Sequence, residues 1–285
     1  MESQLESNLR LLLNSKLDAL EQYLNADVLV YYGPIGNINE NIFLKLVEEL
    51  AKSPNHHDTL YIILTTTGGS AIAVERYVNI IRYHYKEVHF IVPDYAYSAG
   101  TIFCMSGDSI YMDYFSVLGP IDPQVQNKEG KWVAALGYLD KVNEFLEKAK
   151  SGTLTHAEFA ILKDIDLAEL RSFEQARDLT IDLLKKWLVK YKFKNWTQHG
   201  DGRPVTIHDK EQRATEIAGH LSDNNDWKSH GRPINIEGLK ELNLEIEDYS
   251  ENKELRVIIR DYYETMSDYI KLKNFQIFSH DRIYL

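Results

Sequence analysis

A serine between small residues, placed where a strand-like run meets a helix-like run, constrains the fold of this chain most. The β-branched run at 88–92 stops at Pro93-Asp94, and Tyr95-Ala96-Tyr97-Ser98-Ala99-Gly100-Thr101 follows before an apolar helix start. A turn with so little side-chain bulk presents the Ser98 hydroxyl beside bare backbone N–H groups at a helix N-terminus. From this segment alone, Ser98 is either a nucleophile or the cap of a closely packed helix.

A second turn of the same kind occurs earlier in the chain. The strand-like run at 60–64 is followed by Thr65-Thr66-Thr67-Gly68-Gly69-Ser70, and a helix begins at Ala71. Paired glycines permit positive φ and a close approach of the backbone to a ligand. In a parallel sheet both turns open on one edge, where α/β proteins bind ligands. The alternation of strands and helices over 27–112 predicts an α/β fold with a mostly parallel sheet.

Together, Thr-Thr-Thr-Gly-Gly-Ser and Tyr-Ser-Ala-Gly-Thr resemble the two signatures of Clp-fold serine peptidases, which include the Clp protease and signal peptide peptidase A. Leu118-Gly119-Pro120-Ile121-Asp122-Pro123-Gln124 and Ser229-His230-Gly231-Arg232-Pro233-Ile234 resemble the serine dehydrogenase proteinase family of that superfamily. The likeness extends from about residue 27 to about residue 269. It implies a Clp/crotonase-like spiral of β-α-β units, with Ser98 as nucleophile and the backbone of Gly68, Gly69 and Ala99 binding the oxyanion and substrate.

The general base is not evident from the motifs. In the Clp protease a histidine comes from about the region after the serine helix, but here no histidine lies between His89 and His156. Signal peptide peptidases use a lysine, whose amine becomes a base when an apolar pocket lowers its pKa. Lys141 lies among apolar residues on a helix predicted over 133–149, at a similar interval from Ser98, so we expect a Ser98–Lys141 dyad. Two alternatives remain for the base. One is another lysine after the loop, and the other is a histidine beyond residue 198 if the C-terminal part folds over the site; these histidines are His199, His208, His220 and His230.

We predict an N-terminal amphipathic helix within residues 1–25, a Clp-fold core over 26–152, and a mostly helical part over 153–285. This last part is expected to pack on the core or on a neighbouring subunit. It begins with an almost continuously helix-forming stretch over 157–192, free of glycine and proline, and such segments usually form an αα-hairpin that packs on a sheet domain or extends to a partner. The turn at 229–234 has Trp227 beside it as an anchor, and Arg232 either fixes the turn or binds an acidic group.

Composition excludes several classes of protein. The net charge of −11 argues against general binding to nucleic acid or anionic membranes. No run of apolar residues is long enough to span a membrane, the first residues lack a signal-peptide core, and the single cysteine, Cys104, fits a reducing compartment. We expect a cytoplasmic protein without metal or cofactor, and we interpret His56-His57-Asp58 as a solvated loop.

These observations predict a serine endopeptidase that cleaves peptide or protein substrates through an acyl-enzyme on Ser98. The resemblance also implies self-association into a homo-oligomer, with a regulatory partner possible. Two other classes remain open. One is a crotonase-like acyl-thioester enzyme, which would use the same backbone N–H groups on an enolate; the other is a non-catalytic scaffold or effector component with the Clp fold.

Overall fold

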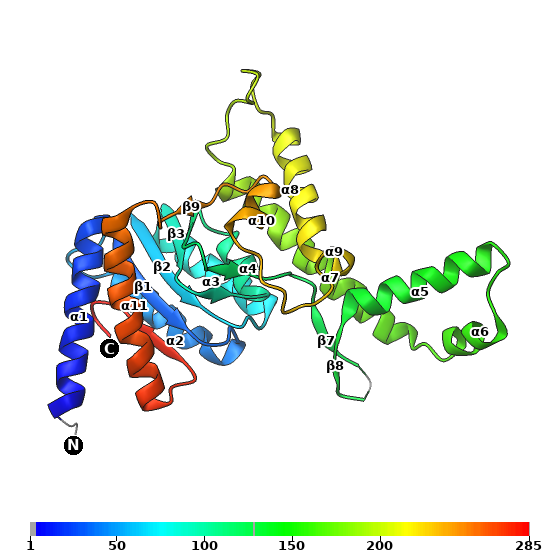
Figure 1. Cartoon of the computed structure of the whole chain (residues 1–285), viewed down its shortest axis with the longest axis horizontal. Helices are drawn as coiled ribbons and strands as arrows, with labels where there is room; N and C mark the ends of the chain where they lie inside the picture. The colour runs from blue at the N-terminus through cyan, green and yellow to red at the C-terminus, as the bar shows by residue number, and fades with distance from the viewer. Residues whose placement is uncertain (1–3, 128, 285) are drawn as a thin grey trace.

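The computed structural model describes residues 4–127 and 129–284, and its centre is a six-stranded sheet (Figure 1). The strand order is β10-β1-β2-β3-β5-β9. Strand β10 pairs antiparallel with β1, and all the other pairs in this sheet are parallel. The predicted α/β fold with a mostly parallel sheet is therefore confirmed. The strands are β1 (Asp27–Tyr32), β2 (Thr59–Thr65), β3 (Glu87–Val92), β5 (Ser109–Met112), β9 (Glu247–Asp248) and β10 (Phe278–His280).

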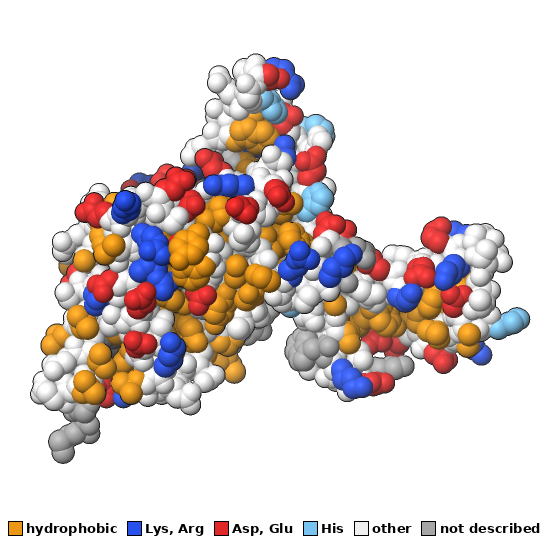
Figure 2. Space-filling view, viewed as in Figure 1, with side chains coloured by type: hydrophobic (Ala, Val, Ile, Leu, Met, Phe, Trp, Pro, Cys, Tyr) orange, Lys and Arg blue, Asp and Glu red, His pale blue; other side chains and the backbone are white. Residues whose placement is uncertain are grey.

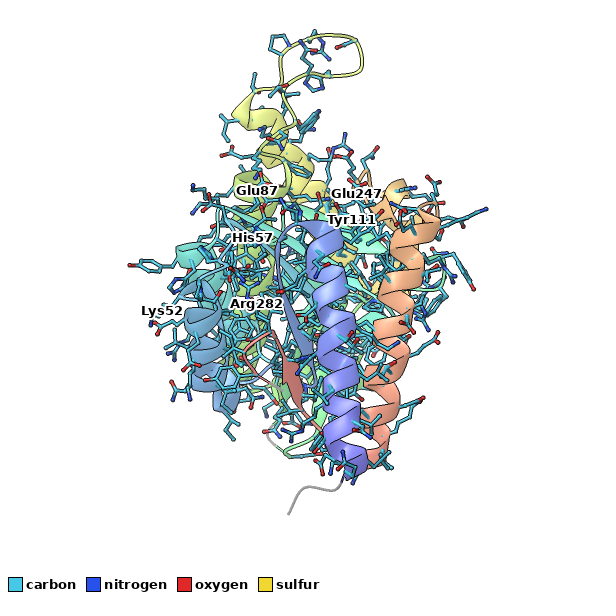
Figure 3. The ribbon with its side chains drawn as sticks, turned by 90° about the vertical axis from the view of Figure 1, so that its left-hand side faces the viewer. Lys52, His57, Glu87, Tyr111, Glu247 and Arg282 are labelled. Atoms are coloured by element: carbon cyan, nitrogen blue, oxygen red, sulfur yellow. The ribbon has the colours of Figure 1, made fainter. Side chains whose placement is uncertain are left out.

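Helices cover both faces of the sheet, because successive strand side chains point to opposite faces. Val28 and Ile63 pack under α1 (Gln4–Leu24) and α11 (Lys253–Lys273), which lie side by side in front of the sheet in Figure 3. Leu29 and Ile62 point to the opposite face. That face is covered by α2 (Glu40–Ala51), α3 (Ala71–His84) and α4 (Ala99–Cys104).

The register of β2 and β3 aligns the two turns singled out in the sequence. Ile62 pairs with Phe90 and Ile63 with Ile91, so both strands end at the same edge of the sheet. The short strand β4 (Tyr95–Ala96) continues beyond β3 and pairs with β6 (Val117–Leu118). Thr66 bridges to Ala96, which joins the glycine turn to the serine turn directly.

After β6 the chain leaves the body as an arm (Figure 1). The arm consists of β7 (Gln124–Gln126), β8 (Trp132–Ala134), α5 (Ala135–Lys150), α6 (His156–Lys163) and the start of α7 (Leu167–Trp187). The stretch expected to be almost continuously helix-forming over 157–192 divides into separate helices at Asp166. This side chain accepts hydrogen bonds from the N–H groups of Ala168 (2.8 Å) and Glu169 (3.3 Å), so it caps a new helix. The last residues of that stretch, Leu188–Lys192, form a π-helical turn.

The C-terminal part returns to the body and completes the sheet. Its helices are α8 (Ile207–Ser222), α9 (Asn224–Trp227), α10 (Ile236–Glu241) and α11. Strands β9 and β10, which the sequence analysis did not predict, form the two edges of the six-stranded sheet. Between α9 and α10, Ile234 forms an antiparallel bridge with Leu118. No helix in the described part of the chain is long and apolar enough to cross a membrane.

Apolar side chains gather on the surface of the arm (Figure 2). Helix α6 has no buried residue, and Phe159 and Ile161 are each 57% exposed. Leu146 on α5 and Leu167 on α7 are also exposed. A contiguous apolar surface of this kind is typical of a contact site for another protein chain. Self-association stays a prediction.

A buried ion cluster fixes the C-terminal end against the first strand. Arg282 donates to Asp27 (2.7 Å) and to Glu21 (3.0 Å), and the Asp27 side chain is fully buried. Asp27 also accepts from the Tyr85 hydroxyl (2.9 Å) and lies 3.1 Å from Nδ1 of His56. Figure 3 shows Arg282 beside α1. Because a buried carboxylate without a partner is costly, this cluster makes β10 docking part of the stability of the core.

Replacing Arg282 by methionine should lower the free energy of unfolding by about 3 kcal/mol, since Asp27 loses its guanidinium while it stays buried. Chemical denaturation measures this change. Arg203→Met is the matched control, because Arg203 pairs with Asp201 while its side chain is 72% exposed. That variant should change stability by less than about 0.5 kcal/mol. Equal effects of the two substitutions would contradict the anchoring role of Arg282.

Candidate active site

Ser98 occupies a strained backbone conformation between β4 and α4. Its φ is 53° and its ψ is −116°, a region that residues with a side chain rarely adopt. The strain is held by the helix that follows, where the N–H of Gly100 donates to Tyr97 O (2.8 Å) and that of Ile102 to Ser98 O (3.2 Å). A sharp strand-to-helix turn of this type exposes a serine hydroxyl at the edge of an α/β sheet.

The Ser98 hydroxyl does not cap the helix that it precedes. No side-chain capping bond is formed at Ser98, and the serine of the other turn provides the contrast. Ser70 accepts a hydrogen bond from the N–H of Ala73 (3.2 Å) and is an ordinary N-cap of α3. The interpretation of Ser98 as a helix cap therefore fails, and its hydroxyl is left available for another role.

Gly68 and Gly69 form a cradle next to Ser98. Both have positive φ, 102° and 144°. A Cβ on Gly68 would lie 2.7 Å from Tyr97 O and 2.8 Å from the Ser98 Cβ, and one on Gly69 would collide with the Ile35 carbonyl. Glycine is therefore required at both positions by conformation and by space. The two turns are in direct backbone contact, as the sequence predicted from their place on one sheet edge.

Two backbone N–H groups near Ser98 are free to bind a ligand. The N–H of Gly68 donates to the Thr66 hydroxyl (3.0 Å) and that of Ser70 to Ile35 O (2.9 Å). By contrast, the N–H groups of Gly69 and Ala99 have no acceptor within the described residues. The N–H of Ala99 also lies in the first turn of α4, where the helix dipole favours negative charge.

The loop at 118–124 is tied to the serine turn by one buried threonine. The Thr101 hydroxyl lies within donating distance of two carbonyl oxygens, those of Ala96 (2.9 Å) and Gly119 (2.8 Å). It also accepts a hydrogen bond from the Gly119 N–H (3.0 Å). Thr101 is fully buried. This contact fixes the start of the loop, whose Ile121, Pro123 and Gln124 line the same cavity as Ser98.

His230 and Asp122 form a hydrogen-bonded pair in the same region. Nδ1 of His230 lies 2.7 Å from Oδ1 of Asp122, whose side chain is only 2% exposed. The other carboxylate oxygen accepts from the Gln124 amide (3.2 Å). His230 reaches this position because Leu118 and Ile234 exchange two backbone hydrogen bonds of 2.9 Å each. The ring can therefore be held in one tautomer, with Nδ1–H facing the carboxylate.

Ser98, Gly69, Ala99 and His230 line one cavity of about 590 Å³. Its remaining wall is largely apolar and includes a side of α7 that carries Leu179. Among the described residues that line this cavity, His230 is the only one with an ionisable side chain. The residues that carry the hydroxyl, the free N–H groups and the imidazole thus border one mostly apolar cavity.

Lys141 lies elsewhere. The structure places it on α5 in the arm, where its side chain is 60% exposed and its ammonium pairs with Glu144 at 2.7 Å. It does not line the cavity that contains Ser98. The predicted helix around Lys141 is present, but the structure does not bring this amine to the serine. Among the other histidines considered, His220 lies 3.0 Å from Asp226 and His199 lies 3.5 Å from Asp209.

Reasoning from the sequence named His230 only as one of four histidines that could replace the lysine, and it did not single out Asp122 or the pairing of the two. Both residues lie in segments that the family resemblance had singled out, 118–124 and 229–234. An acid in one such segment and a histidine in the other was a usable signal. No local sequence pattern predicts the antiparallel bridge between Leu118 and Ile234 that joins the two segments.

The described residues offer little to a metal or to a thiol nucleophile. No group of three or more His, Cys, Asp or Glu side chains in residues 4–127 and 129–284 is arranged to hold a metal ion. Cys104 is fully buried, and burial raises the pKa of its thiol.

In chemical terms this geometry is of the class found in serine hydrolases. The chain belongs to the family of ClpP-like SDH-type serine proteinases, because that family's model matches residues 43–209, more than half of the chain. The match contains Gly69, Ser98 and Asp122 and ends before His230. The resemblance to the serine dehydrogenase proteinase family is thus confirmed.

Two uncharacterized proteins of Methanocaldococcus jannaschii are also similar to this chain. One, MJ1495, is 30% identical over 185 residues, which is 65% of this chain and 51% of the relative. The other, MJ0137, is 28% identical over 186 residues, which is 65% of this chain and 52% of the relative. The chain therefore spans about half the length of the curated relatives that it matches.

Replacing Gly69 by alanine should lower the free energy of unfolding by about 2 kcal/mol or more, because the new methyl group meets the Ile35 carbonyl and φ is positive. Chemical denaturation provides the measurement. Gly36→Ala is a close control in the neighbouring segment, since a Cβ there has nothing within 4 Å. It should be nearly neutral. If both variants were equally stable, the packing of the glycine cradle would be refuted.

Proposed function

We propose that this chain is a serine peptidase in which Ser98 attacks the peptide carbonyl and His230 is the general base. The observation that carries the proposal is the pairing of His230 with the buried carboxylate of Asp122, in the cavity that also contains Ser98. A serine hydroxyl is a weak nucleophile unless a base takes its proton. Among the described residues, His230 is the only ionisable side chain in the cavity that meets this need.

The reaction begins when Ser98 Oγ attacks the carbonyl carbon and its proton passes to Nε2 of His230. The N–H groups of Gly69 and Ala99 donate to the developing oxyanion, aided by the dipole of α4. The imidazolium then gives the proton to the leaving amine, and the acyl group remains on Ser98. Water, deprotonated by the same imidazole, releases the acyl group and restores the enzyme.

Asp122 acts on the reaction through His230. Its carboxylate accepts from Nδ1–H and leaves Nε2 of the ring available to take the proton of the serine. It also stabilises the positive imidazolium that forms during attack. Because Asp122 is 2% exposed and its second oxygen is bonded to Gln124, the carboxylate is held in one orientation.

The position of Lys141 does not support the Ser-Lys dyad that we expected from the sequence. A lysine acts as a base when desolvation lowers its pKa. Lys141 is instead 60% exposed, its ammonium pairs with Glu144 at 2.7 Å, and it does not line the cavity that contains Ser98. We therefore assign the general base to His230.

The cavity also suggests the class of substrate. Its wall carries the apolar side chains Ala71, Ile72, Ile102, Ile121 and Leu179, and none of the described residues in it has a carboxylate or an ammonium group. Burying an apolar side chain in such a space gains about 1.5–3 kcal/mol. We propose that the residue whose carbonyl is attacked has an apolar side chain.

Hydrolysis of a peptide library, followed by mass spectrometry, should show cleavage by the wild type. Ser98→Ala and His230→Gln should reduce the rate by roughly 10³-fold or more, since each removes a reacting group. Lys141→Ala is the matched test of the alternative base and should keep the rate within about threefold. Loss of hydrolysis in Lys141→Ala, with retention in His230→Gln, would reject the assignment of the base.

Introducing a positive charge into the cavity wall should change the cleavage preference. Leu179→Arg should reduce cleavage after apolar residues about tenfold and favour acidic ones, because the guanidinium replaces apolar contact surface. The same library reports this shift. Leu146→Arg, on the arm and outside the cavity, is the control and should leave the preference unchanged. An unaltered preference in Leu179→Arg would show that substrates do not occupy this cavity.

A further inference from the structure

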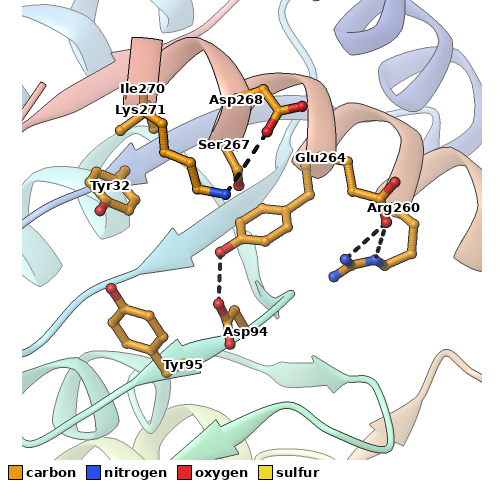
Figure 4. Close-up of a pocket in the computed structure, with 10 residues that line it drawn as sticks. Tyr32, Asp94, Tyr95, Arg260, Glu264, Ser267, Asp268, Ile270 and Lys271 are labelled. Carbon is orange, nitrogen blue, oxygen red and sulfur yellow. Dashed lines mark hydrogen bonds and ion pairs between the residues drawn. The ribbon is translucent and has the colours of Figure 1, made fainter. Parts of the chain in front are cut away.

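A second cavity of about 470 Å³ lies at the same edge of the sheet, on the face that α11 covers. Tyr32 at the end of β1, and Asp94 and Tyr95 beyond β3, form one side (Figure 4). Tyr263 and other residues of α11 form the opposite side. Ser98 and His230 do not line this cavity, so its chemistry is separate from that of the catalytic site.

Most of the charges around this cavity neutralise one another. Arg260 pairs with Glu264 at 3.0 Å and also donates to Pro93 O (3.3 Å). Lys271 and Asp268 lie 3.9 Å apart, and their side chains are 78% and 84% exposed. In Figure 4, Arg260 and Glu264 lie on the side of the cavity away from Tyr32 and Tyr95. These two pairs form the rim and leave no net charge there.

Asp94 is the exception. No lysine, arginine or histidine among the described residues forms an ion pair with it. Its carboxylate accepts one hydrogen bond, from the Tyr263 hydroxyl at 3.3 Å. Asp94 therefore contributes an uncompensated negative charge on the inner side of the cavity.

Three tyrosines, Tyr32, Tyr95 and Tyr263, line this cavity together with Asp94. Burial raises the pKa of Tyr95 to about 12, and the charges of neighbouring groups, Asp94 among them, add to the rise. Burial also raises the pKa of Tyr263 to about 12, against a hydrogen bond from Thr65 that lowers it, and the Asp94 charge raises it further. Both phenols are therefore neutral at physiological pH. Their rings, with that of Tyr32, offer electron-rich faces beside a fixed negative charge.

We propose that this cavity binds an alkylammonium cation, with Asp94 as the counter-ion and the rings of Tyr32 and Tyr95 as cation–π partners. A cation is attracted both by the carboxylate and by the ring quadrupoles, which is how aromatic cages hold ammonium groups. Tyr263 already has such a partner within the chain, because the Arg260 guanidinium lies 5.3 Å from the centre of its ring. An anion would have no unpaired positive charge to bind, since Arg260 and Lys271 are both paired, and Asp94 would repel it.

A ligand in this cavity would touch the segment that leads to the catalytic serine. Asp94 and Tyr95 precede Ser98 in the same turn, and the rings of Tyr95 and Tyr97 stack with centroids 5.6 Å apart. The ammonium group has two possible sources, a free amine or a lysine side chain of a polypeptide. Binding itself does not depend on catalysis, so the inference stands apart from the proposed peptidase activity.

The test is a calorimetric titration of the full chain with choline and with 3,3-dimethylbutan-1-ol, its uncharged isostere. Choline should bind saturably, and the alcohol should bind at least tenfold more weakly because it lacks the charge. A peptide with one lysine, compared with the same peptide carrying norleucine, identifies the source: saturable binding of the lysine peptide alone would support a polypeptide ligand. Absence of saturable binding by both choline and the lysine peptide, or equal binding of the charged and uncharged partners, would overturn the proposal.

Variants of the cavity sharpen the result. Asp94→Asn preserves the shape of the side chain and should weaken the binding of choline at least tenfold. If only the lysine peptide binds, the affinity for that peptide should fall by the same factor. Tyr95→Phe retains the ring face and should bind like wild type, whereas Tyr95→Leu should bind several-fold more weakly. Lys271→Gln removes a positive charge from the rim and should leave affinity unchanged or increase it. Unchanged affinity in Asp94→Asn, or a loss in Lys271→Gln equal to that in Asp94→Asn, would contradict a cation site; melting curves verify that each variant is folded.

Discussion

Two backbone hydrogen bonds between Leu118 and Ile234 hold the proposed catalytic apparatus together. They join a loop that follows the serine helix to a turn that comes more than a hundred residues later, and they place His230 against Asp122. The serine turn itself is held by other contacts, to the glycine turn through Thr66 and to the following loop through Thr101. Without the bridge it would lack a base. In this account, activity therefore depends on the docking of the C-terminal part, which also completes the sheet through β9 and β10.

The serine turn is a case of backbone strain maintained by close packing. Ser98 has positive φ although it is not glycine, while Gly68 and Gly69 leave no space for a Cβ against Ser98 and Ile35. The same close approach leaves the N–H groups of Gly69 and Ala99 unbonded among the described residues. Strain and unsatisfied donors are costly, and they are expected where an oxyanion has to be bound.

The sequence predicted those features that local patterns determine. The strands, the two turns and their shared sheet edge follow from apolar runs and from the glycine and serine motifs, and the family was recognised from the same residues. The pairing of His230 with Asp122, on which the proposed base depends, was not predictable in this way, because it is a long-range contact. The helix that carries Lys141 was predicted correctly, but its position relative to Ser98 was not, because helical periodicity contains no information on how the arm is oriented. At Asp166 a local signal existed, since aspartate is a favoured N-cap, and continuous helical periodicity concealed it.

Labelling of the intact protein by a fluorophosphonate tests the central claim most directly, because the probe reacts only with an activated serine. Our account predicts one adduct on the wild type, no adduct on Ser98→Ala, labelling slowed by roughly 100-fold or more in His230→Gln, and unchanged labelling in Lys141→Ala. Intact mass and rate together report all four. Full labelling of His230→Gln, or no adduct on the folded wild type, would contradict the account.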